Sequence, residues 1–177
     1  MAISGKAAVG ALALAISVLG CGDGVAPGSA LPLGEFEASI SEGEYRTELS
    51  GSAELHANFG GYVVELFDAT VTLANVPIQP SSSLLFFRRI GERPPTGTYD
   101  VTEFEATDPE RFTTGLILFF PMGQLRLVPG SGDVQISEST AEGVAGEFRM
   151  DLKRSGTEFN DDIVARIRGR FNARFEE

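Results

Sequence analysis

Cysteine and histidine are almost absent from this chain of 177 residues, which has one of each, Cys21 and His56. One cysteine cannot form a disulfide framework, and it cannot supply the several thiolates of a structural zinc site. A Ser-His-Asp triad or an imidazole-bound zinc ion would have to use His56, because there is no second imidazole. The fold must therefore rest on its hydrophobic core, to which thirteen phenylalanines can contribute.

Basic residues are also few: 14 Lys and Arg against 25 Asp and Glu give a formal net charge of −11. A surface of this kind should be soluble and should repel nucleic acid and anionic lipid head groups. The chain has no glycine-rich phosphate loop, no dinucleotide fingerprint and no basic-aromatic pattern of nucleic-acid binders. We therefore expect no nucleic-acid partner, no cofactor and no metal site. The case for an enzyme is weakened without being excluded.

The N-terminal hydrophobic run is too short to cross a bilayer. Residues 1–6 contain one positive charge, Lys6, and residues 7–19 are uncharged. The run has the length of a secretory signal and falls short of the roughly 20 apolar residues of a transmembrane helix. Cys21 follows it directly, in the sequence Val18-Leu19-Gly20-Cys21.

This arrangement resembles the signal peptide of bacterial lipoproteins, whose lipobox places a small residue before an invariant cysteine. Gly20 and Cys21 fit that pattern well, Val18 is acceptable three positions before the cysteine, and Leu19 is less usual at its position. The resemblance implies a signal segment over residues 1–20 and lipidation of Cys21. The alternatives are an ordinary secretory signal with a coincidental cysteine and an unprocessed N-terminal anchor.

Lipidation of Cys21 would leave no free thiol and hence no cysteine nucleophile. Without residues 1–20 the formal charge would be about −12, so acyl chains would have to hold the protein at the membrane without help from a basic patch. Residues 21–33 are rich in Gly, Ala and Pro and are expected to form a flexible tether. The resemblance implies a bacterial cell envelope, on the periplasmic or cell-surface side, and Gly22 in place of an aspartate favours the outer membrane.

Residues 34–177 are expected to form one antiparallel all-β domain, a β-sandwich or flattened β-barrel of about eight to ten strands. Apolar side chains alternate with polar ones, and clusters of Gly, Pro, Ser and Asp interrupt the pattern at short intervals. The first expected strand, for example, places Phe36, Ala38 and Ile40 on its inner face.

Two long strands near the C-terminus, joined through residues 154–161, are expected to form a hairpin. A register with Phe148 opposite Ile167 and Glu147 opposite Arg168 matches their apolar faces, and a slip of two residues would match them equally well. The final strand is expected to point a series of apolar side chains inward: Ile163, Ala165, Ile167, Phe171, Ala173 and Phe175.

Two segments, Leu84–Phe87 and Leu116–Phe120, are apolar on both faces. Strands of this kind are usually covered on both sides. The cover could come from the domain's own loops, from a short helix near residues 107–112 or from the opposite sheet. Alternatively, the second face could receive a hydrophobic ligand or a partner protein.

Four β-like segments follow one another between residues 97 and 175: Gly97-Thr98-Tyr99, Gly132-Asp133-Val134-Gln135-Ile136, Val144-Ala145-Gly146-Glu147-Phe148 and Gly169-Arg170-Phe171-Asn172-Ala173. This succession resembles the closing half of small, uncharacterised bacterial envelope lipoproteins. The resemblance implies an all-β fold and an envelope location, and it implies no catalytic residue.

Four arginines occupy one face of the last expected strand: Arg166, Arg168, Arg170 and Arg174. They could bind a carboxylate, a phosphate or an acidic glycan, which the planar guanidinium recognises well. Alternatively, they pair with Glu147, Asp151 and acidic residues of the other neighbouring strand. His56 shares the polar face of its strand with Glu54 and is expected to be an exposed strand residue.

These patterns favour a lipid-anchored envelope protein with a non-catalytic binding or structural role, whose partner is a glycan, a small apolar ligand or another envelope protein. A lipocalin-like carrier of a small apolar molecule is the first alternative, and it would need an apolar cavity. An envelope hydrolase is the second. It would need a concave site at which His56 or a pair of carboxylates converges with other polar groups.

Overall fold

The computed structural model describes residues 31–43, 45–58, 60–69, 71–73, 77–103, 107–155 and 163–176. Within these ranges the chain forms nine strands and no helix: β1 (Glu35–Gly43), β2 (Thr47–Asn58), β3 (Gly61–Asp68), β4 (Ser82–Ile90), β5 (Gly97–Thr102), β6 (Arg111–Phe120), β7 (Gly123–Ser139), β8 (Gly143–Arg154) and β9 (Ala165–Glu176). The prediction of an all-β domain is confirmed. The expected signal segment, Cys21 and most of the expected tether lie outside the described residues.

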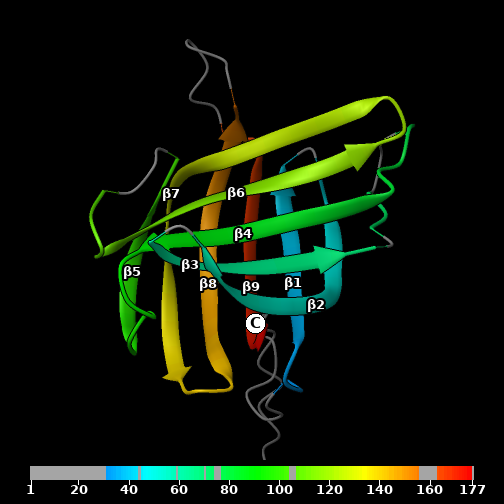
Figure 1. Cartoon of the computed structure of the whole chain (residues 1–177). Coiled ribbons are helices and arrows are strands. Elements are labelled where there is room, and N and C mark those ends of the chain that lie inside the picture. Colours follow the sequence, from blue (N-terminus) through cyan, green and yellow to red (C-terminus); the bar gives the residue numbers. More distant parts are fainter. Residues whose placement is uncertain are drawn as a thin grey trace, which may run out of the picture.

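The nine strands of the described chain form one sheet that closes on itself. Its order is β1-β2-β3-β4-β6-β5-β7-β8-β9, and closure follows because β1 pairs with both β2 and β9. Most neighbours are antiparallel, with short parallel contacts between β5 and β6 and between β2 and β9. Figure 1 shows that the barrel is flattened into two layers whose strands cross at a steep angle.

The front layer contains β3, β4, β6, the second half of β2 and the first half of β7, and the back layer contains β1, β9, β8, β5 and the remaining halves (Figure 1). Both β2 and β7 bend to pass between layers. On β2 the pairing passes from β1 to β3 at Ser52, next to Gly51, where a side chain would collide with the backbone of Phe67. On β7 the bend lies at a register shift between Pro129 and Ser131. Glycine and a proline-containing bulge suit such corners, which sheets packed at right angles require.

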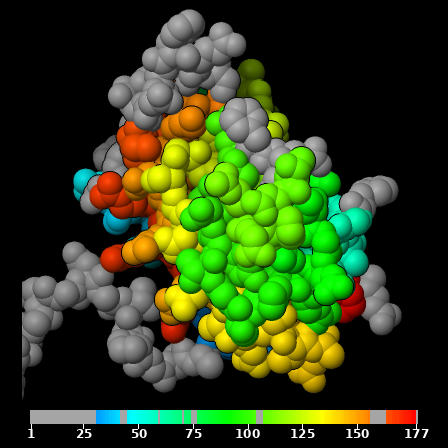
Figure 2. Space-filling model, turned by 90° about the vertical axis from the view of Figure 1, so that its left-hand side faces the viewer, coloured from blue at the N-terminus to red at the C-terminus, as the bar shows by residue number. Residues whose placement is uncertain are grey.

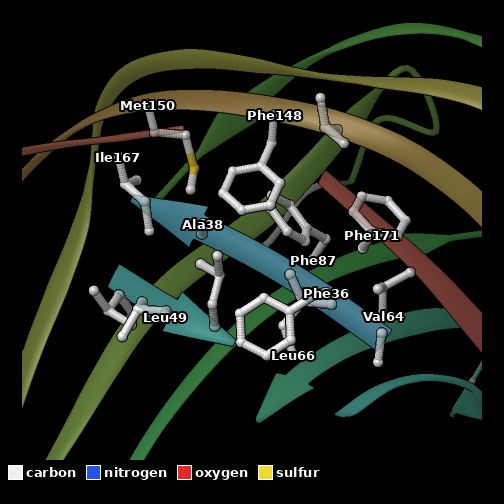
Figure 3. Close-up of a cluster of buried hydrophobic side chains, with 14 of the residues drawn as sticks. Phe36, Ala38, Leu49, Val64, Leu66, Phe87, Phe148, Met150, Ile167 and Phe171 are labelled. Atoms are coloured by element: carbon white, nitrogen blue, oxygen red, sulfur yellow. The ribbon is translucent and has the colours of Figure 1, made fainter. Parts of the chain in front are cut away.

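The hydrophobic core fills the space between the two layers (Figure 3). At its centre the ring of Phe87 lies 5.1 Å from that of Phe148 and 6.0 Å from that of Phe171, measured between centroids. All three side chains are buried, as are Phe36 and Ile40 of the first strand. The alternation expected for the first strand is therefore confirmed, and it places one continuous core inside the barrel.

The expected register of the C-terminal hairpin was wrong by two residues. In the structure β8 pairs with β9 so that Phe148 faces Gly169 and Met150 faces Ile167. The ring of Phe148 covers Gly169, since a Cβ added to that glycine would lie 2.6 Å from the ring. Phe171 packs over Gly146 in the same way: a Cβ added to Gly146 would lie 3.0 Å from the Phe171 ring. Each phenylalanine thus packs over a glycine of the partner strand, which fixes the register.

Two further expectations also need correction. Ile163, expected inside, precedes β9 and is 45% exposed, because it lies beyond the part of the strand that the barrel covers. Phe175, at the other end of β9, is half-buried and packs against the core, as expected. No short helix forms near residues 107–112: residues 108–110 form a bend and turn, and β6 begins at Arg111. The outer face of the front layer is therefore not covered by a helix there.

One end of the barrel contains a buried arginine. Arg89 follows Phe87 on the inner face of β4 and is 6% exposed. Its guanidinium donates hydrogen bonds to the carbonyl oxygens of Pro109 and Glu92, each 2.5 Å long, and lies 5.5 Å from the centre of the Tyr99 ring. Burial raises the pKa of Tyr99, whose hydroxyl donates to the carbonyl of Pro95. Figure 2 shows this end covered by β5 and the adjoining loops, coloured green.

Candidate functional site

The arginine face of β9 lies on the outside of the back layer, among acidic neighbours. Arg166 pairs with Asp151 of β8 at 2.6 Å, and Arg170 pairs with Glu37 of β1 at 2.7 Å. Arg174 donates a hydrogen bond to the carbonyl oxygen of Leu33, 3.2 Å away. Arg168 is exposed and forms no ion pair within the part of the chain that the structure describes. Cross-strand pairing therefore accounts for two of the four arginines, and the hypothesis of an anion site stays a prediction.

The charges continue across the neighbouring strands of the same face. Arg149 of β8 pairs with Asp133 of β7 at 2.7 Å, and the hydrogen bond and the charge of Asp133 raise the pKa of Arg149. Arg149 lies opposite Arg168, and Asp133 offsets this like-charged pairing on the Arg149 side. The outer face of the back layer thus carries ion pairs across β7, β8, β9 and β1, together with the like-charged neighbours Arg149 and Arg168.

Replacing Arg168 and Arg170 together with glutamine tests whether this face binds anions. We expect unchanged binding to vesicles of anionic lipid and to acidic envelope glycans. We also expect a loss of no more than about 1 kcal/mol in the free energy of unfolding, because solvent screens the Arg170–Glu37 pair. Cosedimentation and urea unfolding measure the two quantities. A clear loss of glycan or lipid binding without unfolding would instead support the anion site.

His56 lies on the outer face of β2, as expected, and its Nε2 is 3.1 Å from a carboxylate oxygen of Glu54. The two side chains are 33% and 44% exposed. In the described residues no group of three or more His, Cys, Asp and Glu side chains could hold a metal ion. Among the described residues His56 contacts Glu54 and no further polar side chain that would complete a catalytic triad.

The outer face of the front layer differs from that of the back layer because it carries an apolar patch, which lies among polar residues such as Arg88, Thr113 and Arg126. One row of directly paired residues crosses β3, β4 and β6 through Phe67, Leu84 and Ile117. Phe67 is 42% exposed, and the other two are half-buried. Phe86 and Phe119 share this face. The two segments predicted to be apolar on both faces are thus neighbouring strands: one face fills the core, and the other is partly open to solvent.

A shallow, open groove of about 270 Å³ runs over this face. We call it the front groove and define it by its lining residues, which are Ser52, Glu54, Glu65, Phe67, Leu84 and Phe119. They come from β2, β3, β4 and β6, which lie side by side in Figure 1. The front groove therefore combines an apolar floor with two carboxylates at one side.

The two carboxylates of the front groove lie directly opposite each other, since Glu54 of β2 pairs with Glu65 of β3. The sequence pattern did not reveal this pair. Each glutamate follows the ordinary alternation of its own strand, and their meeting depends on the β2–β3 register. The sequence did indicate that Glu65 lies on a partly apolar face, because Phe67, two positions later, points to the same side of the strand.

Near the groove, the start of the described chain is fastened to the barrel. The side-chain amide of Asn172 donates to the carbonyl oxygen of Leu31, and the backbone N–H of Gly34 donates to the carbonyl of Asn172. A second open depression of about 300 Å³ is lined by Leu33, Gly34, Glu35, Ser52, Ala53, Glu54, Arg174 and Glu176. Both depressions share Ser52 and Glu54, so the chain enters the domain beside the front groove.

The comparisons add no relative. No family model matches the chain, and neither the curated proteins nor the solved structures contain a match to it. Within the described residues, no helix is long and apolar enough to cross a membrane. The function must therefore be inferred from the residues and the geometry above.

Proposed function

We propose that the protein is a lipid-anchored bacterial envelope protein with a non-catalytic binding role, and that it binds its partner on the outer face of the front layer. The observation that carries the binding role is the apolar row of Phe67, Leu84 and Ile117 on a face that is partly open to solvent. An exposed row of apolar residues lowers the solubility of a protein unless a partner or ligand covers it. On the back layer of the same domain, neighbouring outward positions carry ion pairs rather than a row of apolar residues.

The proposed anchor is Cys21, which follows a signal-like segment and is the one cysteine of the chain. The excess of acidic over basic residues supports an attachment through acyl chains, because such a chain has little attraction for anionic lipids. The apolar face would then be presented to molecules in the envelope, above the membrane surface.

Both alternative functions have less support. A lipocalin-like carrier needs an internal apolar cavity, whereas the rings of Phe87, Phe148 and Phe171 occupy the centre of this barrel. A hydrolase needs converging polar groups in a concave site, whereas His56 contacts Glu54 on an open outer face.

Native mass spectrometry of the protein purified from its own envelope tests the proposal. We expect a mature chain that begins at Cys21 and carries the mass of acyl chains, together with a bound molecule that Phe67→Ser removes. The Cys21→Ser variant should lose the acyl mass and leave the membrane fraction. An unacylated mature chain that begins at another residue would overturn the anchor, and a bound species that survives Phe67→Ser would overturn the binding face.

A further inference from the structure

The front groove carries an uncommon combination of charge and apolar surface. Its floor is formed by Phe67, Leu84 and Phe119, and its polar side by Ser52, Glu54 and Glu65. Two aromatic rings next to two carboxylates are the groups that recognise an ammonium ion, because ring faces and carboxylates both attract positive charge. A ligand that meets all of these groups needs an apolar body and a cationic head.

The pairing of Glu54 with Glu65 is the strongest indication of a cation. Like charges at directly paired positions of neighbouring strands destabilise a sheet. The Nε2 of His56 lies 3.1 Å from a carboxylate oxygen of Glu54, and Arg174 of β9 is the strand partner of Glu54 on its other side. Glu65, by contrast, forms no ion pair within the described part of the chain. A positive group bound between the two carboxylates would remove this repulsion. A metal ion is a poor candidate, because no metal-ligating cluster of three groups exists among the described residues.

The other possible occupants fit the groove less well. A dimer of identical faces would enclose four glutamates in one interface, and each copy has a net charge of −11. An anionic membrane surface would be repelled by the same carboxylates. An extended peptide would find no free strand edge, since β3 pairs with β2 and β4, and β4 pairs with β3 and β6. Recognition must therefore use side chains, within a groove of about 270 Å³.

We propose that the front groove binds a small organic cation, an ammonium group on an apolar or aromatic body. The ammonium group lies between Glu54 and Glu65, and the apolar body lies on Phe67, Leu84 and Phe119. This inference rests on the proposed binding role of the outer face of the front layer, and it does not depend on the lipid anchor.

Three aromatic probes of similar size test the charge of the ligand: phenethylammonium, 3-phenylpropionate and 2-phenylethanol. Each is titrated into the full chain carrying Cys21→Ser, which removes the acylation site, with NMR detection of the Leu84 and Ile117 methyl groups. We expect phenethylammonium to bind roughly tenfold more tightly than the anion and the alcohol. Glu54→Gln combined with Glu65→Gln should abolish that preference, while Glu147→Gln, at an exposed position of the back layer, should leave it unchanged.

The outcomes separate this inference from the proposed function. The cation preference would be overturned if the three probes bound equally and the glutamine double variant bound them as well as the original chain does. If Phe67→Ser then abolished binding, the apolar binding face would still be supported. If no probe shifts the two methyl groups, the inference is overturned, and native mass spectrometry still decides the binding role. Circular dichroism of each variant establishes that the β-sheet is intact. Because Glu54 and Glu65 lie on the outer face, their amides are expected to leave the core unchanged.

Discussion

Replacing Phe87 with alanine is expected to lower the free energy of unfolding by about 4 kcal/mol, because the substitution removes a large side chain from the centre of the core. The side chain is fully buried, and its ring contacts those of Phe112, Phe148 and Phe171 with centroid separations of 5.1–6.4 Å. These residues belong to β6, β8 and β9, so Phe87 joins the front layer to the back layer. Its removal would leave a cavity that two crossed layers cannot readily close.

The adjacent residue provides a matched control. Phe86 has the same side chain on the same strand but lies on the outer face, so Phe86→Ala should cost about 1 kcal/mol. Urea unfolding followed by far-ultraviolet circular dichroism measures both changes, since the chain has no tryptophan for fluorescence. Similar losses for the two variants would mean that the aromatic cluster does not hold the layers together.

Replacing Arg89 with alanine is expected to lower the free energy of unfolding by about 3 kcal/mol. The substitution removes the donors to the carbonyl oxygens of Pro109 and Glu92 and the cationic group beside the Tyr99 ring. Because the side chain is buried at the end of the barrel, both carbonyls would lose a partner where water has little access. Lysine should rescue less than half of the loss, since it has the charge but not the planar fork.

Arg168→Ala is the control for Arg89→Ala, because Arg168 is exposed and should contribute little to stability. Arg89→Met adds a further comparison. Burial of a guanidinium without a carboxylate partner is costly, and methionine would remove that cost while filling the space. If Arg89→Met proves as stable as the original chain, the hydrogen bonds of Arg89 only offset its desolvation, and the expected loss for Arg89→Ala would then come from the cavity.

Local periodicity was sufficient to predict that this domain is all-β. The alternation of Phe36, Ala38 and Ile40 places three side chains on one face whatever the strand pairs with, because successive residues of a strand point to opposite faces. The observation that Leu84–Phe87 and Leu116–Phe120 are apolar on both faces was also correct. Its explanation could not be read from the sequence, because it depended on these two strands being neighbours in one sheet.

Register was the quantity that local pattern could not determine. A slip of two residues keeps every side chain on its face, and so the β8–β9 pairing was predicted two residues away from the one observed. The deciding contacts are Phe148 over Gly169 and Phe171 over Gly146, which depend on the shape of side chains across the pair. For the same reason, the pairing of Glu54 with Glu65 in the front groove was not predicted: it depends on the register between β2 and β3.

The sequence by itself determined that the domain is all-β, that its core forms without an internal disulfide, because the chain has one cysteine, and that acidic residues outnumber basic ones. The tertiary structure decided which outward residues share a face. Strand order and register placed Arg166 beside Asp151 and placed Phe67, Leu84 and Phe119 beside Glu54 and Glu65, and closure of the sheet placed Arg170 beside Glu37. These contacts depend on which strands pair and in what register, which alternation does not specify.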